Sequence, residues 1–134
     1  MRETSSGVYY RRIIAAGSGG SVIDCVFCRI IARQTAADIE YEDAHVMAFK
    51  DIYPKAPVHV LIVPKRHIAS IAELSDDDAE VIGRCFLVAR RLGETKGFAD
   101  KGYRVSVNTG PEGGQVVYHV HFHFTAGRQR GHGA

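Results

Sequence analysis

Hydrophobic and polar positions follow one another along the chain in a pattern that predicts two helices and five strands. Apolar residues recur at helical spacing over 26–33, which indicates a short helix. Ser75 followed by three aspartates is typical of a helix start, and this second helix is expected to run to about Lys96 and to stop near Gly97. The β-prone runs lie at 39–41, 46–49, 58–63, 103–108 and 116–125.

The order of these elements predicts the fold class. Three strands follow the short helix, and the last two strands follow the long helix, with a glycine-rich loop over 110–114 between them. Strands that follow one another in this way favour an antiparallel sheet, and hence an α+β fold. The first residues instead carry runs of Gly and Ser, the composition of flexible linkers. We therefore predict a flexible N-terminal extension over 1–24 and one folded domain over 25–134.

Composition excludes several classes of protein. The net charge of +2 is too small to predict nucleic acid as a partner. No apolar run approaches the roughly 18 residues of a membrane span, so no membrane partner is expected. The cysteines number three, an odd count that argues against a disulfide scaffold and for a reducing, cytoplasmic setting. Two of them, Cys25 and Cys28, form a C-x-x-C pair, which is either half of a zinc site or a buried pair in the first helix.

The final strand carries the most informative pattern. His119, His121 and His123 occupy alternate positions, so on a strand they share one face at a spacing of about 6.7 Å. The residues between and after them, Val120, Phe122 and Phe124, would be buried on the other face. Such a histidine row suits either metal binding or nucleophilic catalysis by imidazole, and the alternative is a solvated strand face.

This His-x-His-x-His motif resembles the signature of the histidine-triad (HIT) family, and the resemblance extends over about 25–130. Further matching segments are CVFCRII at 25–31, FKDIYP at 49–54, APVH at 56–59, VPKRHI at 63–68 and NTGPEGGQ at 108–115. The last of these is similar to the Hint branch of the family. The resemblance implies a HIT-like fold: an antiparallel sheet of about five strands with one short and one long helix, pairing as a two-fold homodimer.

The resemblance also implies a chemistry. In the family the middle histidine attacks the α-phosphorus of a purine nucleotide, such as an AMP conjugate, and forms a nucleotidyl-histidine that water cleaves. Carried over, His121 is the nucleophile, and His123 binds a phosphate oxygen. His59 and His119 complete the catalytic histidines. A nucleotide-sensing or adaptor module with little turnover, and a metal-dependent enzyme that holds zinc in the histidine row, are the alternatives.

The nucleotide-binding residues are carried over in the same way. Asp51 matches the acid that accepts hydrogen bonds from the ribose, although a solvated turn residue is its alternative interpretation. The loop around Gly114 and Gln115 is expected to bind phosphate through backbone N–H groups, beside Asn108 and Val116, unless it is a plain connection. The base would lie between apolar residues that could equally be core, namely Phe27, Ile30, Phe49, Ile52 and Leu61.

Two further features follow from the resemblance. C-x-x-C members of the family place a structural zinc on the positions of Cys25, Cys28, His67 and His119. One position departs from the Hint pattern, because many members carry a serine that serves the leaving group where this chain has Val116. The family's Trp-containing C-terminal tail is also absent, since the chain contains no tryptophan. Substrate range and rate are therefore the properties that the resemblance leaves open.

Overall fold

Five strands form one antiparallel sheet in a computed structural model that describes residues 24–128. The predicted N-terminal extension, apart from Asp24, lies outside the described residues. The strands follow the order β1-β2-β3-β5-β4 across the sheet. Their bounds are Ile39–Glu42 for β1, Val46–Lys50 for β2, Val58–Pro64 for β3, Arg104–Val107 for β4 and Phe122–Ala126 for β5. The predicted α+β class with a five-stranded antiparallel sheet is confirmed.

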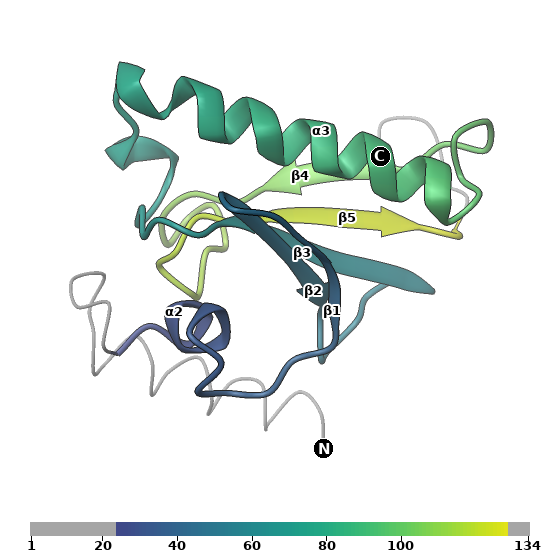
Figure 1. The fold of residues 1–134 in the computed structure, drawn as a ribbon. Coiled ribbons are helices and arrows are strands. Elements are labelled where there is room, and N and C mark those ends of the chain that lie inside the picture. Colours follow the sequence, from purple (N-terminus) through teal and green to yellow (C-terminus); the bar gives the residue numbers. More distant parts are fainter. Residues whose placement is uncertain (1–23, 129–134) are drawn as a thin grey trace.

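Two helices cover opposite faces of this sheet (Figure 1). The short helix α2 (Val26–Ile31) packs on one face, and the long helix α3 (Ala79–Thr95) crosses the other. Two single-turn 3-10 helices, η1 (Ile71–Glu73) and η2 (Asp76–Asp78), precede α3, and the hydrophobic pattern did not predict η1. The predicted start at Ser75 is confirmed, because its backbone N–H donates to Asp78 Oδ2 at 2.9 Å in a capping box.

The sheet separates the interior into two apolar cores, one on each face. Phe122 and Phe124 face α3 and pair in register with Ile62 and Val60 of β3, within one buried apolar cluster. His123 lies between them on the opposite face and pairs with Leu61, which belongs to the second cluster under α2. The predicted alternation of buried apolar and histidine positions is therefore confirmed. It places His123 on the α2 side of the sheet.

The last strand is shorter than the sequence predicted. It begins at Phe122, not at 116, because its neighbour β4 ends at Val107, the partner of Phe122. The preceding segment satisfies its backbone groups differently: Val120 N–H donates to the Ile68 carbonyl at 2.7 Å. As a result His119 and His121 lie outside the regular strand. They do not form the evenly spaced row with His123 that the sequence suggested.

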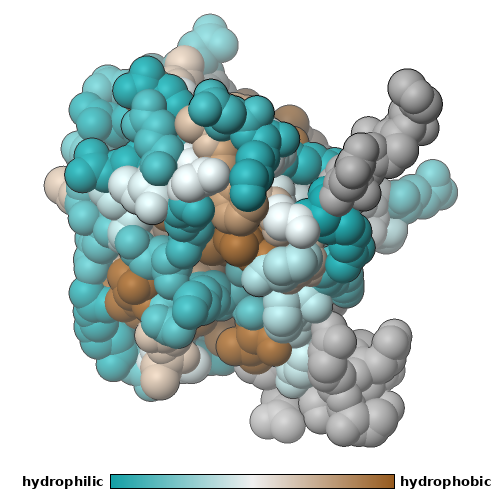
Figure 2. Space-filling view, turned by 90° about the vertical axis from the view of Figure 1, so that its right-hand side faces the viewer, coloured by the Kyte–Doolittle hydropathy of each residue, from teal (hydrophilic) through white to brown (hydrophobic). Residues whose placement is uncertain are grey.

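The large exposed apolar side chains of residues 24–128 include two pairs besides Tyr103. Phe86 and Leu87 are on α3, with 50% and 61% of their surface accessible, whereas Ile52 and Val116 border the cavities described below. On the face seen from the right of Figure 1, hydrophobic residues form separate patches among hydrophilic ones (Figure 2). Neither helix among residues 24–128 is long and apolar enough to cross a bilayer.

Candidate functional site

A cleft on the α2 side of the sheet consists of two adjoining cavities. A polar cavity of about 340 Å³ is lined by histidine, lysine and arginine side chains, and an apolar cavity of about 150 Å³ lies beside it. Asp51 and Leu61 contribute to both linings, so the two cavities are continuous parts of one site. A polar half and an apolar half in contact suit a ligand that is charged at one end and flat and apolar at the other.

The apolar cavity gathers the residues that the sequence predicted around a nucleotide base. Its lining includes all five of them: Phe27, Ile30, Phe49, Ile52 and Leu61. The rings of Phe27 and Phe49 meet edge to face, with their centroids 5.4 Å apart. The segment from Thr35 to Ala37, just after α2, closes one side and was not predicted from the sequence. Helix α2 therefore supplies one wall of the cleft, and strands β2 and β3 supply the other.

His121 is held in a single tautomer by the backbone. Its Nδ1 lies 2.8 Å from the carbonyl oxygen of His119, and because a carbonyl only accepts, Nδ1 must carry the proton and donate. In the neutral ring Nε2 then holds a lone pair. Burial lowers the pKa of His121 below its ordinary value, although the hydrogen bond to His119 opposes the shift, so the ring is neutral near pH 7. A buried, neutral imidazole with a free lone pair is a competent nucleophile.

His59 and His123 form a hydrogen-bonded chain with a defined direction. Lys55 N–H donates to His59 Nδ1 at 3.0 Å, so neutral His59 carries its proton on Nε2. That N–H lies 2.9 Å from His123 Nδ1 and donates to it. His123 must therefore carry its proton on Nε2, a buried atom that has no partner among the described residues. This N–H is an available donor for an oxygen atom in the cleft.

The same chain carries little positive charge near neutral pH. Burial lowers the pKa of His59, against the opposing effect of the Asp51 carboxylate. Burial, together with the neighbouring His121 and His59, lowers the pKa of His123 to about 3. Lys55 adds a smaller effect in the same direction to both histidines.

Asp51 links the two halves of the cleft. Its Oδ1 accepts a hydrogen bond from Tyr53 N–H at 2.8 Å, and its Oδ2 lies 3.4 Å from His59 Nε2. The side chain is nearly buried and lines both cavities. These contacts fix the carboxylate at the junction where a sugar would join a base to a phosphate. We call Asp51, His59 and His123 the cleft group.

The glycine-rich loop is rigid for a reason that the sequence did not reveal. Its amides close the loop on itself, because Gly114 N–H donates to Pro111 O and Gln115 N–H donates to Gly110 O. Gln115 braces it further: Oε1 accepts from Gly110 N–H at 3.0 Å, and Nε2 donates to the Ala69 carbonyl at 2.7 Å. The expected use of the Gly114 and Gln115 amides for phosphate therefore competes with these internal bonds. Asn108, Gly114 and Val116 do line the polar cavity, whereas Gln115 acts from behind it.

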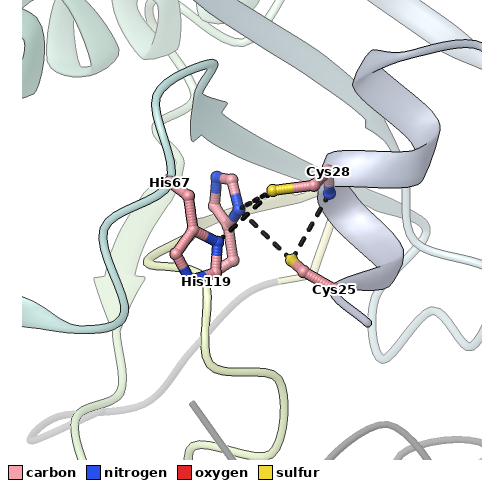
Figure 3. A group of neighbouring side chains, drawn as sticks. All are labelled: Cys25, Cys28, His67 and His119. Carbon is pink, nitrogen blue, oxygen red and sulfur yellow. Dashed lines mark hydrogen bonds between the residues drawn. The ribbon is translucent and has the colours of Figure 1, made fainter. Parts of the chain in front are cut away.

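A second cluster lies beside the cleft and contains both thiols of the C-x-x-C pair (Figure 3). We call its members, Cys25, Cys28, His67 and His119, the metal quartet. The Nδ1 atom of His119 lies 3.4 Å from Cys25 Sγ and 3.6 Å from Cys28 Sγ, and His67 Nδ1 lies 3.3 Å from Cys28 Sγ. Tetrahedral zinc holds such ligands at about 2.0–2.3 Å, which puts ligand atoms roughly 3.3–3.8 Å apart. The quartet therefore fits zinc in both donor type and spacing.

Backbone contacts prepare the quartet for a cation. His119 Nε2 donates to the Pro64 carbonyl at 2.8 Å, so Nδ1 of the neutral ring turns its lone pair toward the sulfurs. Burial lowers the pKa of His119 to about 3 and also lowers the pKa of His67, so both rings are neutral ligands. Burial, followed by the neighbouring Cys25, raises the pKa of the Cys28 thiol to about 12. A charged pair of thiolates thus needs a cation between them.

The ring of His119 is engaged away from the polar cavity. Both ring nitrogens are engaged, one with Pro64 and the other with the cysteines, and the side chain is fully buried. Its ring faces the metal quartet and is absent from the lining of the polar cavity. His119 contributes to the cleft through its backbone carbonyl, which holds His121.

Three cations in the polar cavity were missed by the sequence analysis. The other basic residues near Lys55 in the sequence, Lys50, Lys65 and Arg66, each form an ion pair with an acid. Lys55 instead lines the cavity together with Arg104 and Arg128. Its place four residues before His59 in a short turn was the signal available in the sequence. Arg104 and Arg128 are far apart in sequence and adjoin the site only through the sheet order.

Comparisons with known proteins agree with this geometry. The family model described as "Scavenger mRNA decapping enzyme C-term binding" matches residues 24–134. The purine nucleoside phosphoramidase of Escherichia coli (strain K12) is 42% identical over 108 residues, covering 81% of this chain and 91% of that protein. A HIT family hydrolase from Legionella pneumophila superposes with a TM-score of 0.79 at 41% identity, covering 81% of this chain and 97% of that one. A HIT family hydrolase from Clostridium thermocellum gives a TM-score of 0.78 at 46% identity, covering 80% and 93%.

Proposed function

The chain belongs to the histidine-triad (HIT) family, and we propose that it is a nucleotide hydrolase or transferase of the AMP-phosphoramidate type that acts through a nucleotidyl-His121 intermediate. The observation that carries this proposal is the fixed tautomer of His121, whose Nδ1–H is bound by a carbonyl so that Nε2 is free to attack. The apolar cavity beside it supports a purine base as the other end of the substrate. Similarity to a purine nucleoside phosphoramidase agrees with this substrate class.

In the first step the lone pair of His121 Nε2 forms a bond to the α-phosphorus. The P–N bond to the leaving amine breaks, and its electron pair stays on the amine nitrogen, which takes a proton from a water molecule in the cleft. Donation from His121 Nδ1–H to the His119 carbonyl strengthens as the ring becomes positively charged. The Nε2–H of His123 supplies a hydrogen bond to a phosphate oxygen.

In the second step the hydroxide left by that proton transfer attacks the phosphorus. The bond between phosphorus and Nε2 breaks, and its electron pair returns to His121, so the neutral ring is restored and AMP is released. The cleft group keeps its direction of hydrogen bonding throughout, because the Lys55 N–H fixes His59 and His59 fixes His123. Asp51, at the junction of the two cavities, would accept hydrogen bonds from the ribose hydroxyls.

We propose that the metal quartet holds a structural zinc ion. Cys25 and Cys28 would supply thiolates, and His67 and His119 would supply neutral imidazole nitrogens. Zinc there would tie α2 to the segment that carries His119, whose carbonyl orients His121. The metal would have no part in the reaction steps, because no member of the quartet lines either cavity of the cleft.

We also propose a two-fold homodimer in a cytoplasmic setting. Phe86 and Leu87 are large apolar residues exposed on α3, which suits a face covered by a second copy of the chain. Phe86 is half exposed even though its ring contacts the ring of Phe122, with centroids 5.2 Å apart. The described cysteines are all free thiols, which agrees with a reducing compartment.

The proposal is tested by looking for the covalent intermediate. Adenosine 5′-phosphoramidate is mixed with excess protein and quenched within milliseconds, and intact mass is expected to show an AMP adduct that His121→Ala lacks. His45→Ala is a matched control, since His45 is exposed and distant from the cleft lining. AMP binding without any adduct or turnover would overturn the enzymatic proposal in favour of a nucleotide-sensing module. Loss of turnover with chelator in the still-folded protein would instead indicate a metal-dependent mechanism.

A further inference from the structure

We propose that the end of the polar cavity next to β4 is a subsite for a negatively charged leaving group, held by Lys55, Arg104 and Arg128. This inference rests on the proposed function, because it assigns a position to the part of the substrate beyond the α-phosphate. The negative charge of the leaving group would come from a carboxylate or from a further phosphate.

The strand order sets the direction of the substrate in the cleft. Arg104 on β4 pairs in register with Thr125 on β5, which in turn pairs with His59 on β3. The apolar cavity lies on the other side of this row, against β2 and α2. A nucleotide with its base in the apolar cavity and its α-phosphate at His121 therefore points its remaining group toward β4.

Three cations converge at that end from separate parts of the chain. Lys55 belongs to the connection between β2 and β3, Arg104 opens β4, and Arg128 follows β5. Arg128 Nη2 donates to the Lys55 carbonyl at 2.5 Å, which ties two of these segments together. Attraction to an anion is the interaction that these three side chains share.

Acidic residues do not neutralise this group of cations. Within residues 24–128, no carboxylate forms an ion pair with Lys55, Arg104 or Arg128, whereas Lys50, Lys65 and Arg66 on the adjoining surface all have acidic partners. Asp51 is the one acid in the described lining of the polar cavity, and its oxygens face Tyr53 and His59. The cavity therefore has an excess of positive charge at the end opposite the base.

Val116, which also lines the polar cavity, supports the same conclusion because its side chain cannot donate a proton. Val116 has 40% of its surface exposed. A simple amine needs such a proton to depart, because an amide anion is a very poor leaving group. A phosphate or acyl oxygen departs with its bonding electron pair as a stable anion. When it does, water attacks the adduct and releases its proton to solvent, so both steps balance without a donor at this position.

The first experiment separates charge from leaving-group ability. Two AMP phosphoramidates are compared, one made from propylamine and one from β-alanine, which differ in the terminal group and present the same P–N bond. The carboxylate-bearing substrate is expected to have a kcat/KM about tenfold higher, and the ratio should shrink in about 0.5 M salt as the cations are screened. The ratio is expected to approach one in a Lys55→Gln, Arg104→Gln double variant. Arg90→Gln on the outer surface of α3 is the matched control that keeps the preference.

The second experiment does not depend on turnover. Calorimetry with AMP and ADP reports whether an added phosphate is attracted to the same end, and ADP is expected to bind about tenfold tighter than AMP in the native protein but not in the double variant. Preference for ADP without preference for the β-alanine substrate would identify the anion as phosphate. Equal kcat/KM for both phosphoramidates together with equal affinity for AMP and ADP would overturn the subsite. Absence of cleavage and of adduct with every substrate would overturn the proposed function, and the calorimetry would still decide the subsite.

Discussion

The metal quartet and the cleft group both gather three or four ligand-type atoms within 4.8 Å of one another, yet they are suited to different tasks. In the quartet the Pro64 carbonyl takes the N–H of His119, so that nitrogen lone pairs and sulfurs face a common centre. In the cleft group the N–H of His59 lies between two acceptors, His123 Nδ1 and Asp51 Oδ2. A cation there would have to displace that proton, so the cleft group is suited to ordering protons and the quartet is suited to holding a metal ion.

The comparison shows that a histidine's task depends on the partner of its other nitrogen. His119 and His121 are two residues apart, and each donates one N–H to a backbone carbonyl. The lone pair of His119 then faces thiols in a closed interior, while His121 belongs to the lining of an open cavity. Breaking one cluster should therefore leave the properties of the other measurable.

The largest effect is expected from Cys28→Ala. Loss of one thiolate leaves three ligands, Cys25, His67 and His119, so zinc content should fall from one to well under one per chain. The free energy of unfolding should decrease by at least about 3 kcal/mol. Metal analysis and thermal unfolding measure the two quantities. Cys85→Ala is the matched control, because this buried thiol belongs to the core under α3 and its removal should cost stability while zinc is retained. Full zinc content in Cys28→Ala would contradict the assignment of the quartet.

The second effect is on the cleft group alone. His123→Ala removes the N–H that is free to bind a phosphate oxygen, and kcat for an AMP phosphoramidate is expected to fall about 10²-fold. Zinc content should not change, since within residues 24–128 His123 contacts His59 and His121 and forms no hydrogen bond with a member of the quartet. Steady-state kinetics on the zinc-loaded protein measure the loss. If the variant turns over at the native rate, His123 donates no hydrogen bond to the phosphate in the transition state.

A third variant tests the brace that Gln115 provides behind the glycine-rich loop. Gln115→Ala removes hydrogen bonds from Gln115 to Gly110, Ala69 and Val117, and leaves buried backbone groups unpaired. The free energy of unfolding should fall by about 2 kcal/mol, and amide hydrogen exchange should accelerate across the 110–115 loop while zinc is retained. Unchanged exchange in the loop would mean that its own backbone bonds are sufficient to hold it.

The smallest effect concerns acid stability. His123 has a pKa of about 3 in the folded protein, because it is buried and faces His121, His59 and Lys55, with Asp51 beyond His59. Between about pH 6.5 and pH 3 the unfolded chain therefore binds a proton that the folded chain excludes, so stability is complete above this range and is lost as the pH falls through it. His123→Ala should lose less stability than the native protein from pH 7 to about pH 5.5, by about 1 kcal/mol. Chemical denaturation at both pH values measures the difference, and parallel losses would contradict it.

Much of the fold was predictable because its signals are local. The helix start at Ser75 and the alternation of Phe122, His123 and Phe124 depend on neighbouring residues, and both were predicted correctly. The start of β5 was not, because it depends on where β4 ends on the other side of a loop. The grouping of Cys25 and Cys28 with His67 and His119 was expected from the family resemblance, and the structure brings these four together.

The sequence predicted which residues gather at the site, but not which groups each side chain contacts there. Motif spacing indicated that His119 and His121 belong together, and only the three-dimensional structure shows that their rings contact different clusters. Lys55 and Arg104 were missed because a cation's surroundings depend on contacts between distant segments. The role of Gln115 as a brace was hidden for the same reason, since its partner Ala69 lies in the segment between β3 and η1.

The position of β5 has a consequence for how the protein is made. This strand is the last one within residues 24–128 and yet lies inside the sheet, between β3 and β4. During synthesis on the ribosome, β3 therefore emerges with one hydrogen-bonding edge open, and Val60 and Ile62 stay without their partners Phe124 and Phe122 until residue 126 has been added. An apolar strand edge of this kind attracts other nascent chains. We therefore expect that β5 must pair with β3 rapidly, or that a chaperone must shield this edge, if the nascent chain is not to aggregate.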